Sequence, residues 1–177
     1  MNEALNNILT RRSVKAYKPD MPPQELIDQV AQAGTHAPTG MNRQSPVIIE
    51  VTDKATRDML SKMNADVMGA ETDPFYGAPV VLVVLADKSV GTYMYDGSLV
   101  MENLMLAANA VGLGSCWIHR AKEEFESEEG RALLKKLGIK GDYEGIGHCI
   151  LGYPAGDIPA EKPRKENWIY KIYQASR

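Results

Sequence analysis

PVVLVVLAD, residues 79–87, is a continuous run of β-branched and aliphatic residues. A strand of this composition is buried on both faces of a sheet, so we expect it to lie centrally. Three shorter apolar segments are bounded by turn residues and predict further strands. They are PVIIEV (46–51), SCWI (115–118) and GIGHCILGY (145–153).

Segments with helical spacing of apolar residues separate these strands. The expected helices are 2–10, 23–35, 54–66, 97–111 and 122–139. Alternating strands and helices indicate a fold that mixes α and β structure, and the spacing alone does not decide the strand directions. With 177 residues and no linker or repeat, we expect residues 1–177 to form a single domain.

The expected helix at 97–111 is apolar on nearly every side. Such a helix must be covered all round, which a chain of this size hardly achieves alone. We therefore predict that this helix forms the contact of a homodimer.

Composition and charge exclude several classes of protein. The formal net charge of −3 gives little of the counterion release that drives nucleic-acid binding, so we expect no nucleic-acid partner. No apolar run approaches the ~20 residues that span a bilayer, and the N-terminus lacks a signal-peptide pattern, so we expect no membrane partner and a cytoplasmic location. Cys116 and Cys149 lie apart in apolar strands and are interpreted as buried thiols, with no metal site.

The glycines of GLGS (112–115) could suggest a dinucleotide-binding turn. That fingerprint follows a strand and opens a helix, whereas this one ends a helix and precedes a strand. We predict instead that Gly112 terminates the helix.

Two polar segments could bind a ligand. TRRSVKAY (10–17) combines arginine forks, a hydroxyl and a lysine, a set that fits phosphate, although a solvated basic loop has the same composition. PTGMNRQSP (38–46) offers amide donors and acceptors in a stretch broken by glycine and proline.

Taken in order, the motifs of this chain resemble those of the nitroreductase family of flavoproteins. They are RRS followed by Lys15 and Tyr17, APTGMNRQSP (37–46), YGAP (76–79), GLGSCW (112–117), ILGYP (150–154) and KPRK (162–165). The resemblance implies an α+β, nitroreductase-like fold: a central mixed β-sheet flanked by helices, in an intertwined homodimer with an extended C-terminal arm from Pro154.

The resemblance also implies an FMN site built from several segments. The N-terminal motif would hold the FMN phosphate and ring edge, and Lys15 would neutralise negative charge near N1 and O2 of the reduced ring. The loop at residues 38–46 would reach in from the other subunit. Residues 117–120, at the end of GLGSCW and directly after it, would line the other ring edge. The C-terminal arm would close over the phosphate. The expected FMN-binding residues are Arg11, Arg12, Ser13, Lys15, Pro38, Thr39, Gly40, Asn42, Trp117, Ile118, His119, Arg120, Lys162 and Arg164.

The chain departs from the family pattern in three places. Ser45 stands between Gln44 and Pro46, Val47 replaces a tryptophan, and residues 69–77 give no clear polar match. Asn64 is the nearest candidate for a flavin contact from the middle of the chain. Phe75 and Tyr76 are open to two interpretations, stacking on a substrate or packing in the core.

The implied function is an FMN-dependent oxidoreductase. NADH or NADPH would deliver electrons to the flavin, and a small planar acceptor such as a nitroaromatic or quinone would take them in a ping-pong mechanism. No catalytic side chain is expected, because the flavin carries the chemistry. The alternative is a non-catalytic dimer that binds flavin or nucleotide for storage or sensing.

Overall fold

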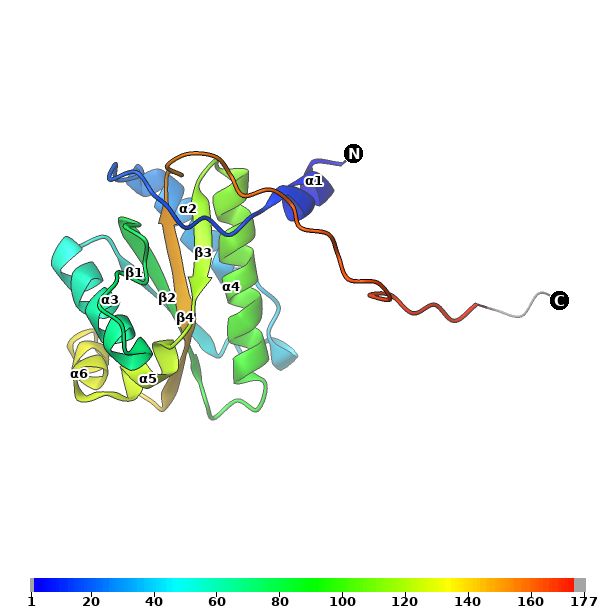
Figure 1. Cartoon of the computed structure of the whole chain (residues 1–177). Coiled ribbons are helices and arrows are strands. Elements are labelled where there is room, and N and C mark those ends of the chain that lie inside the picture. Colours follow the sequence, from blue (N-terminus) through cyan, green and yellow to red (C-terminus); the bar gives the residue numbers. More distant parts are fainter. Residues whose placement is uncertain (1, 174–177) are drawn as a thin grey trace.

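The computed structural model describes residues 2–173, and a four-stranded sheet forms its centre (Figure 1). The strands are β1 (Pro46–Val51), β2 (Val80–Asp87), β3 (Gly114–Ile118) and β4 (Tyr143–Gly152), in the order β1-β2-β4-β3. All three strand pairs are antiparallel. The α+β class is confirmed. We expected a sheet of mixed strand directions, but within residues 2–173 the only parallel pairing is one isolated bridge, between Ser13 and Ser115.

Strand β2 lies between β1 and β4 and is buried on both faces, as its sequence predicts. Its alternate side chains enter two separate cores, as the two-residue period of a strand requires. Val81, Val83 and Leu85 enter one core, and Val80, Leu82, Val84 and Ala86 enter the other.

Helices cover both faces of the sheet (Figure 1). Helices α3 (Lys54–Met68), α5 (Ala121–Glu126) and α6 (Glu128–Lys136) pack on one face, and α2 (Gln24–Thr35) and α4 (Tyr93–Ala110) pack on the other. Helix α1 (Glu3–Thr10) lies beyond α4 and has no buried residue. Within residues 2–173, no helix is both long enough and apolar enough to cross a membrane.

The single helix expected at 122–139 is wrong, because Ser127 divides it. Ser127 has extended backbone angles, and its hydroxyl accepts a hydrogen bond from Gly130 N at 3.1 Å, which caps the start of α6. Serine at an N-cap followed by acidic residues is a favourable helix start. Ser127, Glu128 and Glu129 therefore begin a second helix where apolar periodicity alone predicts continuation.

Helix α4 is covered in part by its own chain. Val100, Met101 and Leu104 are buried in the core that faces α2, whereas the Leu99 side chain is 44% exposed. The helix ends as predicted: Gly112 has a left-handed φ of 79°, and Leu113 N donates to Ala108 O at 2.8 Å. The remaining apolar surface of α4 is available for a partner.

The chain from Pro154 to residue 173 forms an arm without helix or strand, and nearly all of it is exposed. Figure 1 shows it passing α4 and α1 and then leaving the body of the molecule. The extended C-terminal arm is thereby confirmed.

Candidate functional site

The basic segment at residues 11–18 lies extended along β3. Val14 N donates to Ser115 O at 2.9 Å, and the side chains of Val14 and Tyr17 are buried. Because side chains alternate along an extended chain, Ser13 and Lys15 point together toward solvent. The fold thus presents a hydroxyl and an ammonium group side by side, next to two arginines.

Arg11 turns its guanidinium group inward. Its side chain is only 23% exposed, and its Nε lies 4.0 Å from Glu102 Oε1. The Nη1 atom is buried and has no hydrogen-bond partner among residues 2–173. Leaving a buried charged donor unpaired is costly, so this atom is a candidate contact for an anionic ligand.

Arg12 is engaged with the protein itself. Its Nη1 donates to Leu9 O at 2.7 Å and to Arg11 O at 2.9 Å. Its Nη2 lies 3.2 Å from Glu161 Oε2 in the C-terminal arm. Lys162 and Arg164 are exposed neighbours of Glu161, so the structure brings the two basic ends of the chain together.

The loop before β1 is held by Asp96, a buried carboxylate in the first turn of α4. Asp96 Oδ1 accepts from Gly40 N at 3.0 Å, and Oδ2 accepts from the Ser45 hydroxyl at 2.7 Å and from Thr92 Oγ1 at 3.1 Å. Burial acts to raise the pKa of Asp96, but these hydrogen bonds hold the pKa below its usual value. Ser45, one of the residues that depart from the family pattern, is therefore an anchor of the loop.

Three residues of this loop other than glycine have left-handed backbone angles. They are Met41, Asn42 and Gln44, with φ of 54°, 54° and 50°. Such angles cost energy for residues with a Cβ and are concentrated at functional sites. All three side chains are exposed, as is Pro38, while Thr39 and Gly40 are half-buried.

The loop and the basic segment do not meet within one chain. The loop contacts Thr92 and Asp96 at the start of α4, whereas Asn7 just before the basic segment donates to Leu106 O and accepts from Asn109 near its end. At 1.5 Å per residue, Asp96 and Leu106 stand about 15 Å apart along the helix. The loop and the basic segment, which are predicted to share the FMN site, thus lie at opposite ends of α4.

The four residues predicted after GLGSCW have different surroundings. Ile118 is buried in one core, so its side chain is not open to a ligand. Trp117 is half-buried and packs against Gly147, where a Cβ would stand 2.2 Å from Trp117 Nε1. His119 is exposed, and Arg120 is half-buried with a left-handed φ of 78°.

A buried polar network lies behind Arg120. Arg120 Nε donates to Asn64 Oδ1 at 3.0 Å, and Asn64 Nδ2 donates to His119 O at 2.7 Å and to Glu124 Oε1. Glu124 Oε2 in turn lies 3.2 Å from His148 Nε2, close but without hydrogen-bond alignment. Asn64, the nearest sequence candidate for a flavin contact, is buried and occupied by these internal contacts.

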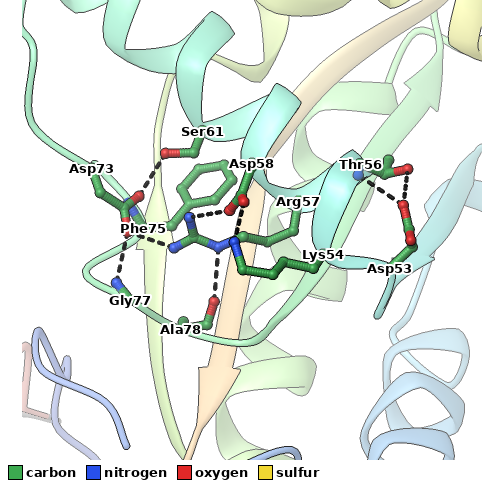
Figure 2. Close-up of polar contacts among 10 residues, drawn as sticks. All are labelled: Asp53, Lys54, Thr56, Arg57, Asp58, Ser61, Asp73, Phe75, Gly77 and Ala78. Atoms are coloured by element: carbon green, nitrogen blue, oxygen red, sulfur yellow. Dashed lines mark hydrogen bonds and ion pairs between the residues drawn. The ribbon is translucent and has the colours of Figure 1, made fainter. Parts of the chain in front are cut away.

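A second network fixes the loop before β2 (Figure 2). The Asp73 carboxylate accepts from Arg57 Nη2 at 2.6 Å, from the Ser61 hydroxyl, and from the backbone N–H groups of Phe75 and Gly77. Burial acts to raise the pKa of Asp73, but the hydrogen bonds from Arg57, Ser61 and the two N–H groups lower it to about 2. Asp73 is therefore ionised at any ordinary pH.

In this loop Phe75 and Tyr76 have different surroundings, although the sequence left both open to stacking on a substrate or packing in the core. Phe75 is fully buried, with its ring centroid 5.1 Å from that of His148, so it is a core residue. Tyr76 is 40% exposed, and Lys15 Nζ lies 5.8 Å from its ring centroid. Tyr76 therefore lies beside the predicted site.

The two cysteines are also as predicted, because Cys116 and Cys149 are buried and form no disulfide. Burial raises the pKa of both thiols. Cys116 lies under the basic segment, and a buried thiol of raised pKa is a poor nucleophile.

The nitroreductase family model matches residues 8–153. This chain belongs to the nitroreductase family. It is 34% identical over 159 residues to a putative NADH dehydrogenase/NAD(P)H nitroreductase of Archaeoglobus fulgidus, covering 87% of each chain. It is 25% identical over 181 residues to an FMN reductase [NAD(P)H] of Bacillus subtilis, covering 93% of this chain and 70% of that one.

A solved nitroreductase with bound FMN from Bacteroides fragilis has the same fold. The TM-score is 0.89 at 28% identity, over 98% of this nitroreductase-family chain and 100% of the other. The family and the fold class inferred from the motifs are thus confirmed. The individual roles of the predicted site residues stay predictions.

Proposed function

We propose that the chain is an FMN-dependent NAD(P)H oxidoreductase that passes electrons to a small planar acceptor such as a nitroaromatic or a quinone. Family membership and the FMN-bound relative support this activity. The observation that carries it is the buried, unpaired Nη1 of Arg11, an unused cationic donor beside Ser13 and Lys15. Bound FMN would accept electrons from the nicotinamide and pass them on.

The residues present fit this cofactor. Arg11 and Ser13 bind the phosphate, and Arg12 holds the arm so that Lys162 and Arg164 close over it. Lys15 supplies positive charge at the ring edge. The backbone and side chains of residues 117–120 line the other edge, and Pro38, Thr39, Gly40 and Asn42 come from the partner subunit. The reaction requires no side-chain acid or base, because solvent supplies the protons that the acceptor takes up.

A homodimer is part of the proposal. The exposed apolar side chains of α1 are Leu5, Ile8 and Leu9, and those of α4 include Tyr95 and Leu99. The arm adds exposed Trp168, Ile169, Tyr170, Ile172 and Tyr173. So much apolar surface is characteristic of an interface. A dimer also supplies the loop at residues 38–45 to the basic segment of the partner, which one chain does not do. The unpaired cysteines support a cytoplasmic location.

A charge on the exposed face of α4 is expected to remove the dimer and the flavin together. Leu99→Glu tests this, because Leu99 is open to a partner, whereas Leu104 on the same helix is buried in its own core. Sedimentation measures the mass and absorbance near 450 nm measures bound FMN. The matched control is Met59→Glu, an equally exposed apolar position on α3. A monomeric Leu99→Glu protein that retains full flavin content would contradict the assignment of the loop to the partner's site.

The test of activity is spectroscopic and kinetic. We expect purified protein to carry FMN absorbance that NADH or NADPH bleaches without oxygen. One slot over the flavin serves both substrates in turn. Plots of reciprocal initial rate against reciprocal nicotinamide concentration, at several fixed quinone concentrations, should therefore be parallel lines. Flavin that dithionite bleaches but reduced nicotinamides do not would point to the non-catalytic alternative. Intersecting lines would require a second substrate site.

A further inference from the structure

Tyr76 holds an exposed ring on a strained backbone. Its φ is 51°, in the left-handed region that residues with a Cβ seldom adopt, and its side chain is 40% exposed. Neither neighbour exposes an aromatic ring, because Phe75 is fully buried and Gly77 has no side chain. A large aromatic group placed outward at a conformational cost indicates a role beyond packing.

The strain is maintained by contacts on both sides of Tyr76. The N–H groups of Phe75 and Gly77 donate to Asp73 at 2.9 and 2.8 Å. The buried Arg57 joins Asp73 to the end of the loop, because its Nη2 bonds Asp73 and its Nε donates to Ala78 O at 3.0 Å (Figure 2). Asp73 and Arg57 together clamp the backbone from which the Tyr76 side chain projects.

The Tyr76 ring lies beside Lys15, the lysine that is predicted to contact the edge of the flavin ring. Lys15 Nζ is 5.8 Å from the Tyr76 centroid, within the range of a cation–π contact. Lys15 shares its extended segment with Arg11, whose unpaired donor marks the anion site. Tyr76 therefore lies beside the predicted cofactor site, on a loop whose sequence gives no clear polar match to the family pattern.

We propose that Tyr76 is the aromatic wall of the substrate slot, against which planar, electron-poor rings stack when they lie over the flavin. The nicotinamide and aromatic acceptors are the ligands of this class. A phenol ring offers such rings an offset-stacked face at little conformational cost, since the clamp holds its backbone in place. This inference rests on the proposed function and adds to it the residue that selects for planarity.

The test compares a planar acceptor with one that needs no stacking. The Tyr76→Leu variant keeps apolar bulk and removes the ring, and Tyr76→Phe keeps the ring. With benzoquinone we expect Tyr76→Leu to raise KM roughly three- to tenfold with kcat nearly unchanged. With ferricyanide, an octahedral inorganic acceptor, and reduced nicotinamide at saturation, the kcat/KM for ferricyanide should stay at the wild-type value, and FMN content should not change. Tyr76→Phe should match the wild type with both acceptors.

Each other outcome overturns the inference. An equal loss with ferricyanide, an unchanged KM for benzoquinone, a Tyr76→Phe defect as large as that of Tyr76→Leu, or loss of FMN from Tyr76→Leu would assign Tyr76 another role. Failure of the proposed function is distinguishable, because the wild-type protein would then reduce neither acceptor.

Asp73 is a positioning residue in this scheme. Asp73→Asn should reproduce the raised KM for benzoquinone with ferricyanide turnover intact. Asp66→Asn, an exposed position of α3, is the matched control. A folded Asp73→Asn protein with a normal KM would show that the clamp does not place Tyr76.

Discussion

Replacing Arg11 with alanine is expected to weaken FMN binding roughly ten- to a hundredfold. The buried Nη1 of Arg11 has no partner among the described residues, so a phosphate oxygen gives it the charge-assisted hydrogen bond that it lacks. Such a bond contributes about 1.5 to 3 kcal/mol. Fluorescence titration of apoprotein with FMN measures the change in Kd.

Riboflavin provides the control within the same experiment, because it has the ring and ribityl chain of FMN but no phosphate. Arg11→Ala should leave the affinity for riboflavin unchanged and thereby reduce the preference for FMN by roughly ten- to a hundredfold. Lys18→Ala removes one positive charge from an exposed position of the same segment and should have little effect on either ligand. Equal affinities of the wild-type protein for FMN and riboflavin would place the phosphate elsewhere.

Glu124→Ala is expected to lower the free energy of unfolding by about 3 kcal/mol. Glu124 and His148 are both fully buried, and removing the carboxylate leaves one donor of Asn64 without its partner and an empty space beside His148 Nε2. An unsatisfied buried donor and the cavity left by a deleted side chain together have a cost of this size. For a chain of this length the midpoint of thermal unfolding should fall by roughly 6 to 12 °C.

The matched control is Glu123→Ala, the adjacent and exposed glutamate of α5, which should unfold at nearly the wild-type temperature. Calorimetry of the three proteins at equal FMN saturation makes the comparison. Similar midpoints for both variants would mean that the buried network is not a source of stability.

Strands and helices were predictable where the pattern of apolar residues matches the burial that the element needs. Strand β1 has the bounds that its sequence predicts, and β2 is buried on both faces because its seven apolar residues serve two cores. The division between α5 and α6 was missed, since periodicity continues across Ser127 and only the capping hydroxyl distinguishes the two helices. A serine followed by acidic residues was the signal that could have revealed it.

The sequence predicted which segments contribute to the candidate site, but not how these segments lie relative to one another. RRS and KPRK were both assigned to phosphate, and their meeting through Arg12 and Glu161 depends on the path of the arm, which no local pattern encodes. The sequence could not tell which of the adjacent aromatic residues Phe75 and Tyr76 is buried. Their burial depends on the backbone path of the loop, which the hydrogen bonds to Asp73 fix. The burial of Asn64 could not be predicted, because it depends on Arg120 and Glu124, which are distant in the sequence.

The pairing of the basic segment with the start of the arm limits where this protein can be cut or redesigned. Lys18 N donates to Tyr153 O, Ala155 N donates to Ala16 O, and Tyr17 bridges to Pro154. Cleavage after β4 would strip hydrogen-bond partners from residues more than a hundred positions earlier in the chain. The first and last parts of the sequence thus form one inseparable unit, and a chimera between relatives would have to exchange both parts together.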